Sequence, residues 1–92
     1  MEYRIRKEDR PAFIDAMKRL SHERRRDGAY AWGLQEHSQD SERIVEWFLL
    51  ESWAEHMRQH HRVSQADADL QNEAVRFHQG PGRPAVHHFL SL

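Results

Sequence analysis

Hydrophobic positions in the first half of the chain follow two different periods. Over residues 2–6 and 30–35, large apolar residues alternate with polar or small ones, which is typical of strands with one packed side. Between these two segments, Phe13, Met17 and Leu20 recur at helical spacing. The pattern predicts a strand, a helix and a second strand, in that order along the chain.

The predicted helix carries a start signal and an end signal. Asp9, followed by Arg10 and Pro11, supplies a capping carboxylate and a proline where a helix begins. At the other end, arginines at positions 24–26 precede Gly28. Cations favour the negative end of a helix dipole, and glycine accepts the left-handed conformation of a C-terminal cap. We interpret the arginines as a solvated helix end, with a phosphate-binding patch as the alternative.

The segment from Arg43 to Glu51 is apolar on both faces. One face holds Val45, Trp47 and Leu49, and the other holds Ile44, Phe48 and Leu50. A strand that is apolar on both sides is covered on both sides. A polar turn at residues 38–41 joins this strand to the preceding one as a hairpin. Helices of so short a chain can cover one face, so the second face predicts a partner subunit, most simply a twofold homodimer.

Glu46 belongs to the second of these sets, because it lies between Ile44 and Phe48. A carboxylate in apolar surroundings either meets a cation or a hydrogen-bond donor, or has its pKa raised by desolvation. In the first case it pairs with an Arg or His of the neighbouring strand, or of the partner, and fixes the register. In the second case Glu46 is a candidate catalytic base.

The second half of the chain contains two helix starts. Residues 52–55, Ser-Trp-Ala-Glu, fit a capping box, and residues 64–67 repeat the signal in weaker form. We therefore expect a short helix to about residue 62 and a longer one from Gln65 to about Gln79.

A glycine- and proline-rich loop ends the second helix, and a last strand is expected from Ala85 to Ser91. The order strand, helix, strand, strand, helix pair, strand is that of a ferredoxin-like βαββαβ fold. We expect residues 1–92 to form a single α+β domain with an antiparallel sheet, in which the first and third strands are central.

Composition excludes several classes of protein. The chain contains no cysteine, which rules out disulfides, thiolate metal sites and cysteine nucleophiles. Lys and Arg total 14 against 15 for Asp and Glu, a net charge of -1 that argues against a nucleic-acid partner. No apolar run approaches the length of a membrane span, and the first ten residues lack the apolar core of a signal peptide. We expect a cytoplasmic protein with no direct membrane insertion.

The eight histidines raise the question of a metal site. His56 and His60 have the spacing of a zinc pair, but Met57 occupies the place of the glutamate in the zincin pattern. A third ligand would have to come from elsewhere in the chain, for instance Glu46 or His87. We favour surface histidines, and expect no metal and no cofactor.

The tryptophans are interpreted as core and interface anchors. The alternative is that they form a cofactor box. We also expect a small apolar or aromatic ligand as a candidate partner. The candidate ligand-binding residues are Trp32, Trp47, Phe48, Trp53 and His87.

Three segments carry a family resemblance: "RRRDGAYAWGL", "VEWFLLESWAEHMRQHHRVSQAD" and the closing "VHHFL". Together they resemble the soluble C-terminal region that follows the transmembrane helices in major facilitator transporters of the transmembrane secretion effector family, related to enterobactin exporters. The resemblance implies a free-standing or excised version of the exporter's soluble tail.

More distantly, the order of elements and the Glu-Ser-Trp at residues 51–53 resemble antibiotic biosynthesis monooxygenase-like domains, which form dimeric α/β barrels. Haem-degrading members of that group use an Asn on the first strand and a Trp near the end of the third. Residues 2–6 contain no Asn, and Leu50 stands about where the Trp would be. His60 falls roughly at the place of their helix His, the iron ligand. Haem degradation is therefore disfavoured.

Two function classes follow. In the first, the protein is a small homodimeric module that binds an apolar ligand or acts as a relative of the exporter's tail. In the second, it is a cofactor-independent monooxygenase, with Glu46 or His60 as the base that removes a phenolic proton from an aromatic or quinol substrate. We favour the module, because the residues that a catalyst would need show no arrangement sharper than the fold requires.

Overall fold

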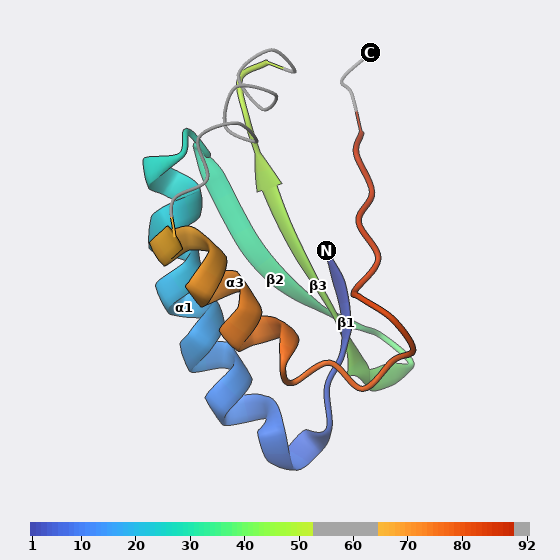
Figure 1. Ribbon diagram of the computed structural model, residues 1–92. Helices are drawn as coiled ribbons and strands as arrows, with labels where there is room; N and C mark the ends of the chain where they lie inside the picture. The colour runs from blue at the N-terminus through green and yellow to red at the C-terminus, as the bar shows by residue number, and fades with distance from the viewer. Residues whose placement is uncertain (53–64, 90–92) are drawn as a thin grey trace.

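The computed structural model describes residues 1–52 and 65–89, which fold into one antiparallel sheet with helices against one face (Figure 1). The sheet has the order β1 (Glu2–Arg4), β3 (Asp40–Leu49), β2 (Ala31–His37). The helices are α1 (Arg10–Arg26), which follows a 3-10 turn at Lys7–Asp9, and α3 (Gln65–Val75). The predicted α+β class is confirmed, and the arrangement is compatible with a ferredoxin-like fold.

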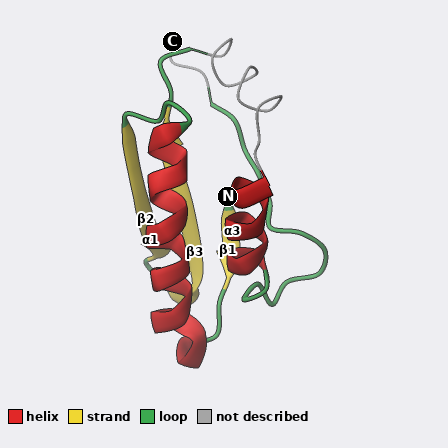
Figure 2. Ribbon diagram, turned by 60° about the vertical axis from the view of Figure 1, so that its left-hand side comes forward, coloured by secondary structure: helices red, strands yellow, loops and turns green. Residues whose placement is uncertain are grey.

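Helix α1 lies beside α3, and together they cover the sheet (Figure 2). The stripe predicted from its spacing is buried, since Phe13, Met17 and Leu20 are at most 1% exposed. They pack in one core with Tyr3 and Ile5. Leu70 and Val75 of α3, and Phe77 just beyond it, are partly buried against the same core, so this helix also packs through an apolar face.

Both ends of α1 lie at the predicted residues, and of the predicted end signals only the Asp9 side-chain cap is absent, since Pro11 lies in the first turn. Gly28 has a φ of 108°. Its N–H donates to the carbonyl of Arg25, and the N–H of Ala29 donates to that of Arg24, which is the Schellman arrangement. At the N-terminus, Asp9 makes no side-chain cap. Its carboxylate accepts instead from Nε of Arg6, because an arginine three residues earlier offers a charged donor.

The two faces of β3 are covered in the opposite way to our expectation. Ile44 is 4% exposed and Glu46 is 1% exposed, and both lie on the side of the helices. The uncovered face is the other one, where Val45, Trp47 and Leu49 are 36%, 37% and 46% exposed. Assigning Ile44 and Phe48 to the uncovered face was therefore wrong. The apolar pattern was the same on both sides, so it could not identify the side on which α1 returns.

The predicted last strand is wrong over residues 86–89. Ala85 forms one isolated bridge with Glu2, and residues 86–89 have no regular secondary structure. The bridge places the segment next to β1, where a fourth ferredoxin-like strand would lie. The second helix also ends earlier than predicted, at Val75. The capping box and the short helix expected after Ser52, together with residues 90 and 91, fall outside the described part of the chain.

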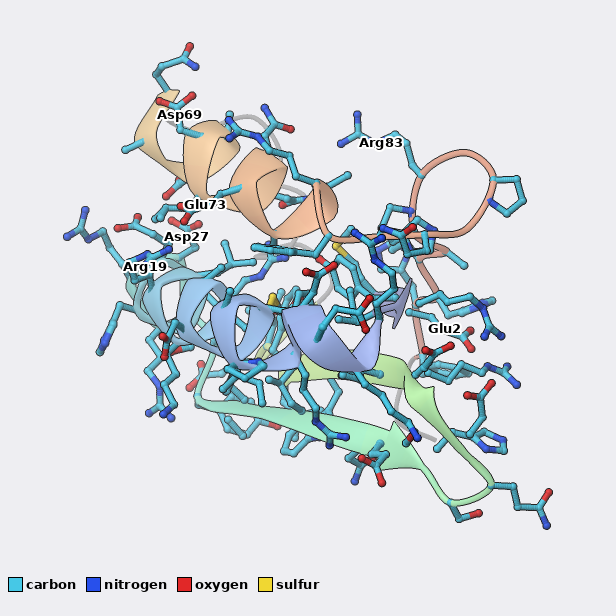
Figure 3. The ribbon with its side chains drawn as sticks, turned by 90° about the horizontal axis from the view of Figure 1, so that it is seen from below. Glu2, Arg19, Asp27, Asp69, Glu73 and Arg83 are labelled. Atoms are coloured by element: carbon cyan, nitrogen blue, oxygen red, sulfur yellow. The ribbon has the colours of Figure 1, made fainter. Side chains whose placement is uncertain are left out.

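Carboxylates gather where the C-terminal half of α1 lies beside α3. Figure 3 shows Asp27, which follows α1, near Glu73 of α3, and Arg19 of α1 pairs with Glu73. A side-chain hydrogen bond with Asp67 raises the pKa of Glu23. Burial raises the pKa of Asp27, and the charge of Asp67 raises it further. Folding therefore favours the protonated forms of these groups.

The raised pKa values of Glu23 and Asp27 predict that this cluster contributes more stability as the pH falls, opposite to Glu2 and Asp40, whose pKa values are lowered. Stabilisation from a raised carboxyl pKa is present below the ordinary pKa of the group and is lost as the pH rises through the folded value. Asp67→Asn removes one negative charge from the cluster. We expect it to raise the Tm by about 2–4 °C at about pH 7 and to give no gain at about pH 4.

Thermal unfolding followed by circular dichroism measures this difference. Asp69→Asn is the matched control, because Asp69 is exposed and its carboxylate accepts from Nε2 of Gln65 in the same helix. A gain for Asp67→Asn that is equal at both pH values would contradict the carboxylate cluster as its cause.

Candidate functional site

The carboxylate of Glu46 lies under the sheet and is held by two side chains. Its Oε2 accepts from Nε1 of Trp32 at 2.8 Å and from Nε of Arg24 at 3.0 Å. Its Oε1 accepts from Nη2 of Arg24 at 3.0 Å. The arginine therefore binds the carboxylate in the two-pronged geometry that guanidinium groups prefer. Of the two alternatives for Glu46, a charged partner or a pKa raised by burial without one, the structure shows the charged partner. The cation comes from α1, however, and not from a neighbouring strand as expected.

Arg24 is the residue that the sequence interpretation missed, because it was taken as one of three solvated arginines. Its side chain is 16% exposed, whereas Arg25 and Arg26 are exposed. The guanidinium also lies 4.7 Å from the centre of the Phe48 ring, within the range of a cation–π contact. A signal was present in the sequence: position 24 continues the Phe13, Met17, Leu20 stripe by one more helical step.

The start of β1 closes the other side of this polar group. The N–H of Glu46 donates to the carbonyl of Met1 at 2.8 Å. Tyr3 is fully buried, and burial, followed by the charge of Glu46, raises the pKa of its hydroxyl well above its ordinary value. The hydroxyl of Tyr3 therefore stays protonated throughout the physiological range and acts as a donor.

The opposite face of the sheet is apolar at its centre. Trp47 lies across β2 at Gly33, its paired residue. A Cβ at Gly33 would come within 2.5 Å of the Trp47 indole, so the absence of a side chain there lets the ring lie against the neighbouring strand. Ala31 pairs with Leu49 on the same face. We call Ala31, Gly33, Val45, Trp47 and Leu49 the open face.

The residues proposed from the sequence do not form one site. Trp32 and Phe48 lie with Glu46 on the helix side, whereas Trp47 lies on the open face. His87 is exposed on the segment after Ala85, with its ring 6.4 Å from that of Phe89. Trp53, His56 and His60 lie outside the described residues. In residues 1–52 and 65–89, no group of three or more His, Asp or Glu side chains is arranged to hold a metal ion.

The buried pair predicts an asymmetry between single and double substitutions. Glu46→Leu leaves the Arg24 cation buried without its carboxylate, and we expect a loss of about 3–5 kcal/mol in the free energy of unfolding. Adding Arg24→Met removes the second charge and restores most of that loss. Urea unfolding of the two variants measures the difference.

Arg43→Met is the control, because Arg43 pairs with Glu2 at the surface. It should cost less than about 1 kcal/mol. Additive losses in the Arg24 and Glu46 double variant would show that the two side chains do not act as a pair.

Comparison with known proteins gives a family but no individual relative. A family model described as transmembrane secretion effector matches residues 1–92. No curated protein and no solved structure matches the chain. The wider resemblance to monooxygenase-like domains gains no support from these comparisons. In the described ranges, none of the helices has the length and apolar character that crossing a bilayer requires. The match over its full length shows that the chain belongs to the transmembrane secretion effector family.

Proposed function

We propose that this chain is a self-associating module of the transmembrane secretion effector family, in which two copies pack their open faces together as a dimeric α/β barrel. The observation that carries the proposal is the exposure of Val45, Trp47 and Leu49, at 36–46%, on the central strand of the sheet. Apolar side chains grouped on one sheet face are typical of a surface that another layer covers.

The charges beside the open face favour a second copy as the occupant. Two ion pairs lie across the sheet on this side, Arg43 with Glu2 and Arg4 with Asp40. Each pair is neutral, so a twofold arrangement brings no excess of one sign against itself. A twofold interface uses the same patch on both subunits, and a neutral patch with an apolar centre meets that condition.

The shape of the open face favours the same arrangement. The Trp47 ring lies against the backbone at Gly33, so the indole lies along the open face at its centre. Two packed sheet faces lie about 10 Å apart. The exposed Trp47 of each copy would then line the space between the sheets, which supports a small apolar or aromatic molecule as the class of ligand.

No observation on the described residues favours the monooxygenase alternative. Its candidate base Glu46 is engaged with Arg24 and Trp32, and His60 lies outside the described ranges. The donors around Glu46 suit an ion pair that orients the helix on the sheet. We therefore assign Glu46 a structural role in this proposal.

The proposal predicts a dimer that a charge on the open face dissociates. Leu49→Lys replaces an apolar contact of roughly 1.5 kcal/mol in each copy, or about 3 kcal/mol in a symmetric dimer, which corresponds to roughly 100-fold weaker association. Val45→Lys should act in the same direction. Light scattering coupled to size exclusion, and analytical ultracentrifugation over a concentration series, measure the change.

Tyr30→Lys is the matched control. Tyr30 is 60% exposed but directly precedes Ala31, so strand alternation puts it on the side away from the open face. It should leave the dimer intact. A monomeric native chain, or equal dissociation by the Tyr30 and Leu49 substitutions, would refute the open face as the contact.

A further inference from the structure

Three hydrogen-bond donors converge on the sulfur of Met1. The hydroxyl of Tyr3 lies 3.6 Å from Sδ, Nη2 of Arg24 lies 3.6 Å from it, and Nε2 of Gln71 lies 3.5 Å from it. The three donors come from β1, α1 and α3. A thioether is only a weak acceptor. The donors around this sulfur therefore suit a stronger hydrogen-bond acceptor than a thioether.

Each donor is fixed by other contacts. Arg24 is held by the Glu46 carboxylate, and its Nη1 donates to Oε1 of Gln71 at 3.4 Å. That bond turns the amide of Gln71 so that its Nε2 faces the sulfur. Tyr3 is fully buried between the sheet and the helices. The donors are therefore preorganised around Sδ before any change at the sulfur.

We propose that Met1 is a reversible oxidation site, at which the oxygen of methionine sulfoxide is received by Tyr3, Arg24 and Gln71. The oxidant is hydrogen peroxide. A lone pair of Sδ attacks one peroxide oxygen, the O–O bond breaks, and the departing hydroxide takes up the remaining proton as water. Sulfur loses two electrons, and peroxide is reduced. In the reverse direction, two thiols of a methionine sulfoxide reductase become a disulfide, and the oxygen leaves as water.

Oxidation of Met1 is expected to stabilise the fold, whereas oxidation of a packed methionine usually destabilises it. Oxidation of a packed methionine normally disrupts its surroundings, because it puts a polar group among apolar ones. At Met1 the new oxygen meets three donors that at present share a sulfur. Stronger bonds to that oxygen would join β1 to both helices. Met17 provides the contrast, since it is fully buried in the hydrophobic core.

The test uses the full chain with Met57→Leu, so that Met1 and Met17 are the methionines left to react. After treatment with hydrogen peroxide, peptide mass mapping should find oxygen on the half-buried Met1 well before Met17. We expect the Met1 sulfoxide form to unfold at a Tm about 3–6 °C above the untreated protein at the same concentration. Methionine sulfoxide reductase should return both mass and Tm to their starting values. A Tm that falls or stays unchanged on oxidation overturns the proposal.

Two substitutions test the donors separately. Tyr3→Phe removes only a hydroxyl, and Gln71→Leu removes only the amide, so each should reduce the gain in Tm on oxidation by at least about a third. Gln79→Leu is the matched control, because the Gln79 side chain is exposed and donates to the carbonyl of Phe77. A gain of the same size in Tyr3→Phe, Gln71→Leu and Gln79→Leu would show that the donors do not receive the oxygen, and the proposal would fall.

Discussion

The ion pair between Arg24 and Glu46 is the constraint on which the arrangement of this domain depends. A carboxylate that is 1% exposed beneath a sheet must be compensated by a cation and by donors. The compensating guanidinium comes from the last turn of α1. Its position fixes both the rotation of the helix and its height over β3. Apolar contacts from Phe13 and Met17 tolerate some sliding, whereas a two-pronged ion pair has one geometry.

The same pair explains how the two faces of the sheet differ. Strand alternation that turns Glu46 towards α1 must also turn Val45 and Trp47 away from it. A helix can cover only the side that it faces, and the chain has placed both described helices on the side of the carboxylate. The open face therefore follows from the location of the buried charge, and its apolar character is left for another layer to cover.

Local signals in the sequence predicted local structure well, and failed where a long-range contact decided the outcome. Gly28 was predicted as a cap because a left-handed residue after a helix needs only local geometry. Arg24 was not distinguished from Arg25 and Arg26, because the three residues are of one type and differ only in the side of the helix on which each side chain lies. The uncovered face of β3 was predicted wrongly for a related reason. The residues on the Ile44 face are as apolar as those on the Trp47 face, so the sequence did not show which face the helices cover.

The prediction of a C-terminal strand failed for a different reason. Alternation over residues 85–91 predicted a strand, yet a strand needs a neighbour whose backbone it can pair with. The bridge of Ala85 to Glu2 and the bond from Gln79 to Arg4 already use the outer edge of the short β1. Residues 86–89 lie beyond that pairing.

The guanidinium of Arg24 contacts both the Glu46 carboxylate and the Met1 sulfur. Nη2 donates to Oε1 of Glu46 and lies within 3.6 Å of the Met1 sulfur. Nη2 carries two hydrogens, so it can serve a stronger acceptor at Met1 and Oε1 of Glu46 together, while the bond from Nε to Oε2 holds the arginine in place. Glu46 is one residue from Trp47 on β3, so the buried polar group and the open face are neighbours along one strand.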